Sequence, residues 1–229
     1  MLADADRRAP DAYLCLGDIV GYGPDPNECV ARVRTLGAAT VTGNHDRGAV
    51  GLLATTVFSP LARAAIEWTA GVLTADARGY LSALPERIES PALLAVHGSP
   101  RDPIEEYILD LPTALAVFTE SAFTLCLVGH THLPGLFLKD PDGRIGTRNL
   151  PPDEPVPLPD SSRYIVNAGS VGQPRDGDRR AAYLVFDDGA GGGRAVTLHR
   201  IGYDIAATQA KMAARGLPPL LARRLASGT

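Results

Sequence analysis

The chain has 229 residues, which is enough for one domain with a sizeable hydrophobic core. Hydrophobic residues make up 45% and charged residues 21%, the ordinary balance of a soluble globular protein. The formal net charge of −4 argues against a broad nucleic-acid-binding face, although a bound metal can supply positive charge for an anionic substrate.

No stretch is long and apolar enough to span a bilayer, and the start "MLADADRRAPD" lacks the order of a signal peptide. The three cysteines, Cys15, Cys29 and Cys126, fit neither a zinc nor a disulfide pattern. We therefore expect a reducing, cytoplasmic setting and no membrane contact.

The first half of the chain alternates short apolar runs, typical of buried strands, with stretches typical of helices. Asp25 can cap one helix, Pro26 suits its first position, and Gly37 is expected to end it. The elements expected here are the end of a helix at 1–9, a strand at 12–16, a helix at 26–36, a strand at 38–43, a loop at 44–46, and a helix at 60–84 with a break near Gly79.

The second half of the chain is richer in strands, and Asp142-Gly143 is a hairpin-turn signal. The elements expected here are strands at 87–90 and 92–99 around a turn at Pro91, a helix at 112–121, a strand and loop at 123–132, a hairpin at 135–150, a proline-rich loop at 151–162, strands at 163–170, 181–188 and 194–202, and a helix pair at 203–229 around Gly216.

This order of elements predicts the fold class. Early strands that alternate with helices, followed by antiparallel hairpins, indicate an α/β domain of two mixed β-sheets packed together with helices outside. We expect one domain over residues 1–229, with residues 203–229 as a helical tail packed on it.

Four polar clusters follow apolar runs, at the strand ends where α/β proteins gather their sites. Taken singly, each has a plain explanation as a turn residue, a helix cap or a satisfied histidine. The pair in "VGHTH" is harder to explain, because residues two apart in an extended chain share a face and adjacent imidazoles repel when protonated. The clusters contain Asp18 in "LGDIVGYG", Asn44, His45 and Asp46 in "TGNHD", His97 in "AVHGS", and His130 and His132 in "VGHTH".

A divalent cation would remove the repulsion between these imidazoles. One carboxylate, one amide and three imidazoles without thiolates suit manganese, iron, zinc, cobalt or nickel, and argue against a structural zinc. One carboxylate can bridge two cations, and two cations can hold a hydroxide for in-line attack on phosphorus. Only His199, in an alternating strand, lies outside the clusters, and we expect it on the surface.

The order of the motifs GD, GNHD, VHGS and GHTH resembles the calcineurin-like metallophosphoesterase superfamily over nearly the whole chain. Within it, "GDIVGYGPDPNEC", "NAGSVGQPRDGD" and "GLPPLLARRL" are similar to a bacterial branch grouped with diadenosine tetraphosphatases and Ser/Thr phosphatases. The resemblance implies the αββα sandwich of that family. It also implies hydrolysis of a phosphomonoester, phosphodiester or pyrophosphate bond by attack of a metal-bridging hydroxide.

The resemblance further implies the metal ligands and the kind of substrate. Asp18 would bridge two divalent cations, Asn44, His97 and His130 would complete the second site, and His132 would ligate the first. Manganese is the expected metal, with iron, zinc, nickel and cobalt as alternatives. A small phosphorylated molecule, nucleotides included, is the expected substrate.

Three more residues receive roles from the same resemblance. His45 would contact the substrate phosphate and act on the leaving oxygen as general acid or charge stabiliser, and Asp46 would orient His45. Arg175 in "GSVGQPRDGDRR" would fork onto the phosphate; the alternative is an exposed arginine of a solvated loop.

The family's first motif, Asp-x-His on the first strand, has no counterpart in this chain. The first metal site then keeps only Asp18 and His132. A start upstream of Met1 would explain this, and it is favoured because residues 1–9 resemble a helix without its cap and first turn. The other explanation is a shortened protein that lacks the first strand.

Three hypotheses about function follow from these patterns. The first is a two-metal phosphoesterase, and the second is a non-catalytic or weakly active binding module of the same fold, motivated by the incomplete first metal site. The third is a structural one-metal protein whose histidines only hold loops together, which would unfold when the metal is chelated.

Overall fold

The structure is a computed structural model that describes every residue of the chain except residue 191. The strands are β1 (Leu14–Cys15), β2 (Ala39–Thr40), β3 (Arg87–Glu89), β4 (Leu94–Val96), β5 (Leu125–Val128), β6 (Gly135–Lys139), β7 (Ile145–Arg148), β8 (Pro155–Pro157), β9 (Arg163–Asn167), β10 (Ala181–Asp187) and β11 (Ala195–Ile201). The helices are α1 (Leu2–Asp6), α2 (Pro26–Thr35), α3 (Asn44–Val50), the 3-10 turn η1 (Thr55–Val57), α4 (Pro60–Val72), α5 (Ala75–Ser82), α6 (Leu111–Glu120), α7 (Ile205–Ala214) and α8 (Pro219–Ser227).

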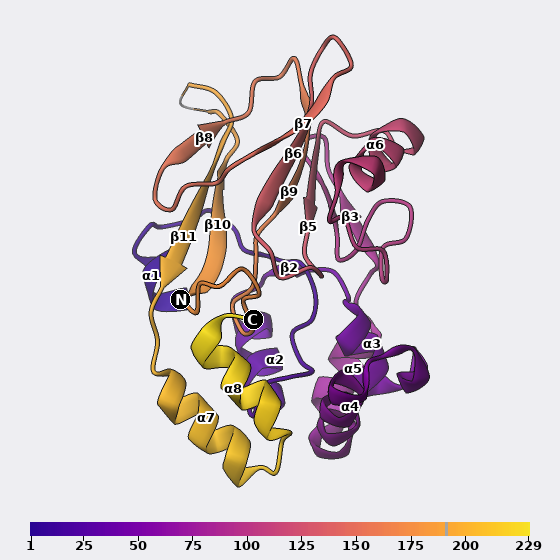
Figure 1. Ribbon diagram of the computed structural model, residues 1–229, viewed down its shortest axis with the longest axis vertical. Coiled ribbons are helices and arrows are strands. Elements are labelled where there is room, and N and C mark those ends of the chain that lie inside the picture. Colours follow the sequence, from indigo (N-terminus) through magenta and orange to yellow (C-terminus); the bar gives the residue numbers. More distant parts are fainter. Residues whose placement is uncertain (191) are drawn as a thin grey trace.

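The strands form a six-stranded sheet in the order β3-β4-β5-β9-β6-β7, a three-stranded sheet in the order β10-β11-β8, and a separate pair β1-β2. Within the large sheet β4, β5 and β9 run parallel, whereas β3, β6 and β7 are antiparallel to their neighbours. Figure 1 shows the three-stranded sheet on one side of the large sheet and α6 on the other. The prediction of an α/β fold with mixed sheets is confirmed. The strands 14–15 and 39–40, however, bond to each other as a third sheet.

The large sheet is hydrophobic on both faces, because each face is covered by another layer. Leu125 and Leu127 point into the core shared with the three-stranded sheet. The alternate residues Cys126 and Val128 pack with Phe118 of α6 on the opposite face. Successive side chains of β5 alternate between two covered faces, and the strand is therefore a continuous apolar run.

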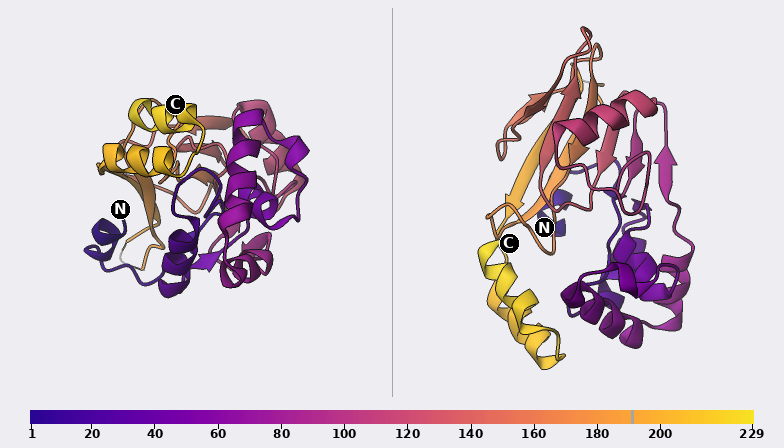
Figure 2. Two further views of the ribbon diagram at one scale, coloured as in Figure 1. Left: turned by 90° about the horizontal axis from the view of Figure 1, so that it is seen from below. Right: turned by 45° about the vertical axis from the view of Figure 1, so that its right-hand side comes forward.

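Two helical groups lie beyond the sheets, as Figure 2 shows. The helices α2, α3, α4 and α5 share a core that includes Val30, Ala49 and Ile66. The C-terminal pair α7 and α8 packs through Met212 and Leu221 against Ala65 of α4. No described helix reaches the length and apolarity needed to cross a membrane.

Three predicted elements differ from the structure. The predicted loop 44–46 is the first turn of α3, because the Asp46 carboxylate accepts a hydrogen bond from the Gly43 amide and so stabilises the start of the helix. The break in the helix 60–84 falls before Thr74, whose side chain caps α5, and not near Gly79. The proline-rich loop contains β8, which is an edge strand bonded to the central strand β11, and prolines are tolerated at a sheet edge.

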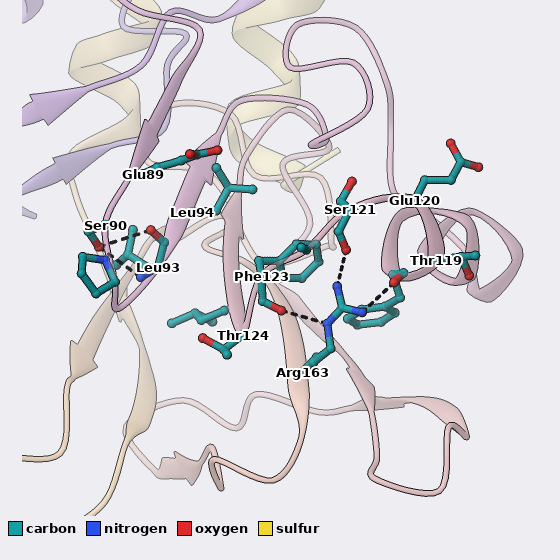
Figure 3. Close-up of a pocket in the computed structure, with 14 residues that line it drawn as sticks. Glu89, Ser90, Leu93, Leu94, Thr119, Glu120, Ser121, Phe123, Thr124 and Arg163 are labelled. Atoms are coloured by element: carbon teal, nitrogen blue, oxygen red, sulfur yellow. Dashed lines mark hydrogen bonds between the residues drawn. The ribbon is translucent and has the colours of Figure 1, made fainter.

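A cavity of about 690 Å³ lies at the amino ends of β4, β5 and β9, next to the end of α6 (Figure 3). Arg163, the first residue of β9, spans it and donates to the carbonyls of Phe123 at 2.8 Å, Phe118 at 2.6 Å and Ser121. Its guanidinium also lies 4.7 Å from the ring centroid of Phe123. Arg163 therefore satisfies backbone carbonyls at the end of α6, and its own donors are engaged in doing so. We interpret the cavity as a structural feature for this reason.

We expect Arg163→Ala to lower the free energy of unfolding by about 2 kcal/mol, because hydrogen bonds from a charged donor to several carbonyls are lost. Urea denaturation measures this change. Arg144→Ala is the control, since Arg144 is exposed and pairs only with Asp142 in the hairpin turn, and it should change stability little. Equal midpoints for the two variants would contradict this role of Arg163.

Candidate metal centre

The three parallel strands of the large sheet bring polar residues together at their carboxyl ends. His97 directly follows β4, His130 comes two residues after β5, and Asn167 is the last residue of β9. Asp18 lies in the loop after β1, and Asn44 begins α3 after β2. Strand ends from two sheets therefore meet at one place, which lies at the other end of β4, β5 and β9 from the Arg163 cavity.

Asp18, His97 and His130 form a group whose potential ligand atoms all lie within 4.8 Å of one another. His97 Nε2 is 3.3 Å from Asp18 Oδ2, 3.1 Å from His130 Nδ1 and 3.3 Å from Asn44 Oδ1. His97 is thus the geometric centre of the group. The sequence motifs predicted all four of these residues.

Backbone carbonyls fix the tautomers of the two histidines. His97 Nδ1 donates to the Leu16 carbonyl at 2.7 Å, and His130 Nε2 donates to the Glu105 carbonyl at 3.1 Å. A carbonyl only accepts, so the neutral rings carry their lone pairs on His97 Nε2 and His130 Nδ1, which face each other. Together with the Asp18 carboxylate and the Asn44 amide oxygen, four acceptor groups converge on one point. A divalent cation satisfies such a set.

The electrostatics of the group fit a cation at this point. Burial opposes charge on Asp18, but the surrounding imidazoles of His97, His45 and His132 outweigh it and hold the pKa of the carboxyl below its usual value. Burial, together with His97, lowers the pKa of His130 to about 4, so its ring is neutral near pH 7. Burial would also lower the pKa of His97, but the Asp18 carboxylate raises it, so a proton on His97 and a cation compete for the same place.

The backbone is strained where the ligands are attached. Asp18, His130 and His132 have φ values of 52°, 62° and 61°, in the left-handed region that residues other than glycine seldom adopt. Each such residue costs on the order of 1–2 kcal/mol. A side chain at Gly43 would place its Cβ 2.0 Å from Asp18 Oδ1, so only glycine allows this approach. Strain and close packing both concentrate at the metal centre.

His132 lies next to this group but outside its 4.8 Å set. Its Nδ1 donates to the Gln173 carbonyl at 2.7 Å, which leaves Nε2 as the free ligand atom. Burial, with the nearby Arg175, lowers the pKa of His132 to about 3. Arg175 bonds to the Gln173 side chain at 3.0 Å and to the Tyr22 hydroxyl at 3.3 Å. Arg175 is therefore half-buried beside His132 and is not an arginine of a solvated loop.

His45 and Asp46 belong to the first turn of α3, which contacts Asp18. The His45 amide donates to Asp18 Oδ1 at 2.9 Å, while its ring packs 4.3 Å from the Tyr22 ring and makes no hydrogen bond to a described residue. The Asp46 carboxylate accepts from the amides of Val20 and Gly43, and it makes no hydrogen bond to His45 Nδ1. Asp46 therefore influences the position of His45 through the backbone segments whose amides its carboxylate accepts.

Sequence reasoning missed several residues at the centre. Asn167 donates to the Thr131 hydroxyl at 3.0 Å and so braces the loop that carries both histidines. Tyr22, Gln173 and Tyr107 also contact the ligands or Arg175. The only available signals were the aromatic between two glycines in "GYG" and the tyrosine that ends "GSPRDPIEEY".

The expectation for His199 is wrong. Its ring is only 3% exposed, and Nδ1 pairs with Asp153 at 2.6 Å, because the alternate face of β11 is covered where the chain at Asp153 folds against it. His199 lies outside the metal centre as expected.

Comparisons with known proteins agree with this geometry. Residues 1–189 match the family model of the calcineurin-like phosphoesterase superfamily domain. An uncharacterized protein of Methanocaldococcus jannaschii is 34% identical over 236 residues, an alignment that covers 100% of this chain and 91% of that protein. The chain therefore belongs to the calcineurin-like phosphoesterase superfamily.

Solved structures support the same assignment. A metallophosphoesterase from Sphaerobacter thermophilus is 45% identical and superposes with a TM-score of 0.86, covering 100% of this chain and 91% of that one. A hypothetical protein from Pyrococcus horikoshii shares the fold, with a TM-score of 0.74 at 19% identity over 100% of this chain and 91% of its own.

We expect His97→Gln to weaken manganese binding by more than the roughly 10- to 100-fold that loss of an outer hydrogen-bond partner costs, because the central ligand atom is removed. Isothermal titration measures the affinity. His199→Gln is the matched control, a buried histidine outside the centre, and its affinity should equal that of the wild type. Unchanged binding by His97→Gln would place the metal elsewhere.

Proposed function

We propose that this protein is a metal-dependent phosphoesterase that cleaves a phosphomonoester, phosphodiester or pyrophosphate bond at the site formed by Asp18, Asn44, His97 and His130. The convergence of four acceptor groups on one point carries the proposal, since no proton arrangement of neutral histidines satisfies them. When bound, divalent cations activate water for attack on phosphorus and neutralise the phosphoryl oxygens.

The residues around the cation site supply the groups that a phosphate needs. Arg175 is held by Gln173 and Tyr22, so its guanidinium is pre-organised to fork onto phosphate oxygens. His45 has a ring without a hydrogen-bond partner among the described residues, beside Asp18. We assign it to donate a hydrogen bond to the phosphoryl or leaving oxygen, as general acid or charge stabiliser.

A second cation would lie between Asp18 and His132, with Asp18 as the bridge. The sequence motifs assign only these two residues to that side, which would make it the weaker of the two sites. Manganese is the proposed metal at both positions, because mixed oxygen and nitrogen ligands suit it, and iron, zinc, nickel and cobalt remain alternatives.

The weakness of the second cation site favours a second candidate function. With one firm cation site, the chain would be a binding module that holds a phosphorylated ligand and turns it over weakly or not at all. Equilibrium dialysis with manganese separates the two candidates: two bound equivalents support the enzyme, and one equivalent without turnover supports the module.

The substrate and location complete the proposal. A small phosphorylated molecule, nucleotides included, suits a site with one arginine and two cations. Three free cysteines, one of them exposed, motivate a cytoplasmic location.

We expect manganese-dependent hydrolysis of bis(p-nitrophenyl) phosphate or p-nitrophenyl phosphate, and its loss in Asp18→Asn, because the bridging carboxylate becomes a neutral amide. The decrease in kcat/KM should exceed about 100-fold, more than an outer-shell change costs. Asp153→Asn is the control, since Asp153 pairs with His199 away from the centre. Absence of hydrolysis with every divalent metal would contradict the enzyme, and unfolding on chelation would favour a structural metal.

Gly21→Ala should displace the His45 ring, because a Cβ at Gly21 would lie 2.2 Å from His45 Nδ1 and the φ of +130° suits only glycine. We expect kcat/KM to fall by about 100-fold, the cost of a misplacement near 1 Å, while manganese affinity is retained. Gly23→Ala is the matched control, since a Cβ there meets nothing within 4 Å. If both variants keep full activity, His45 has no role in the reaction.

A further inference from the structure

Tyr107 covers one side of the metal centre with an aromatic ring. The ring stacks on the His130 imidazole, with centroids 3.8 Å apart and planes inclined by 19°. Tyr107 is nevertheless 44% exposed. Because the imidazole covers one face, the exposure belongs to the other face and the ring edge. An open aromatic face therefore lies next to a metal ligand.

The segment that carries Tyr107 is held firmly. Ile108 is buried directly beside it, and the Glu105 carbonyl two residues earlier accepts from His130. The Glu106 carboxylate accepts from Ser99 and Arg101, and Arg101 also reaches Glu120. The exposed ring is thus fixed in place before any ligand binds.

The apolar surface continues beyond Tyr107. Exposure alternates along this extended segment, so Tyr107 and Leu109 share the outward face, and Leu109 is 58% exposed. A second tyrosine at the centre, Tyr22, packs against His45 and Arg175.

Positioning of His130 alone does not explain this arrangement. The Glu105 carbonyl already fixes the His130 ring, and a tyrosine that only packs on it gains more by being buried. Leaving two adjacent apolar side chains exposed at the edge of a site is typical of a surface that contacts a ligand.

We infer that Tyr107 is a specificity residue whose open face stacks on a planar aromatic group attached to the substrate phosphate, with Leu109 extending the contact. The inference rests on the proposed function, because the metal centre and Arg175 would hold the phosphate. An aryl ester and a nucleobase share this chemistry. Stacking of one base on an aromatic side chain contributes about 1–3 kcal/mol, or roughly 5- to 150-fold in affinity.

The test uses phenylphosphonate and cyclohexylphosphonate as probes, which have the same charge and similar size but differ in aromaticity. Binding to the manganese-loaded protein is measured by isothermal titration, independently of turnover. We expect the wild type and Tyr107→Phe to prefer phenylphosphonate by at least about 5-fold. Tyr107→Leu should lose the preference and keep its manganese affinity, whereas Tyr203→Leu, a tyrosine just before α7, should keep the preference.

Two results would overturn this inference and leave the proposed function intact. One is equal binding of both phosphonates by the wild type. The other is a Tyr107→Leu variant that loses both phosphonates equally together with manganese, which would reduce Tyr107 to a positioning residue for His130. If the manganese-loaded wild type binds neither phosphonate, the proposed function fails as well, so the two failures are distinguishable.

Competition experiments separate the two sources of an aromatic group. If adenosine monophosphate displaces phenylphosphonate better than ribose phosphate does, and Tyr107→Leu removes the difference, a nucleobase is the stacked group. If the two compete equally while the preference for phenylphosphonate depends on Tyr107, an aryl ester is the stacked group.

Discussion

Unsatisfied lone pairs at the carboxyl ends of β4, β5 and β1 are the constraint on which the rest of this structure depends. Backbone carbonyls orient the rings of His97 and His130 so that their free nitrogens face each other and the Asp18 carboxylate. Such an arrangement is unfavourable without a cation or a proton between the groups. Backbone strain adds to this cost, since Asp18 and His130 both adopt left-handed backbone conformations.

The surrounding layers serve to hold these groups in place. The parallel strands β4, β5 and β9 end at one edge because they run in the same direction, and they are buried between α6 and the three-stranded sheet. Asn167 at the end of β9 braces the loop of His130 and His132, and Asp46 ties the loop after Asp18 to the start of α3. Tyr22 and Tyr107 then pack on the centre, against His45 and His130 respectively.

The sequence was most informative where chemistry depends on residue type and spacing. Polar residues after apolar runs led to the prediction that Asp18, Asn44, His97 and His130 gather at one site, because α/β proteins place such residues at strand ends. Other features depend on contacts between distant segments: the pairing of His199 with Asp153, and the stacking of Tyr107 on His130. A local signal was also missed: the Asp46 carboxylate accepts the amide of Gly43, three residues earlier, and this bond caps a helix where a loop was predicted.

The central claim is that a cation replaces the proton among four converging acceptors. Anomalous diffraction at the manganese edge, from crystals grown with manganese, tests this claim most directly. We expect a peak whose nearest protein atoms are the Asp18 carboxylate, Asn44 Oδ1, His97 Nε2 and His130 Nδ1. A structure without a peak at this position, in which these four groups keep their arrangement, would contradict it.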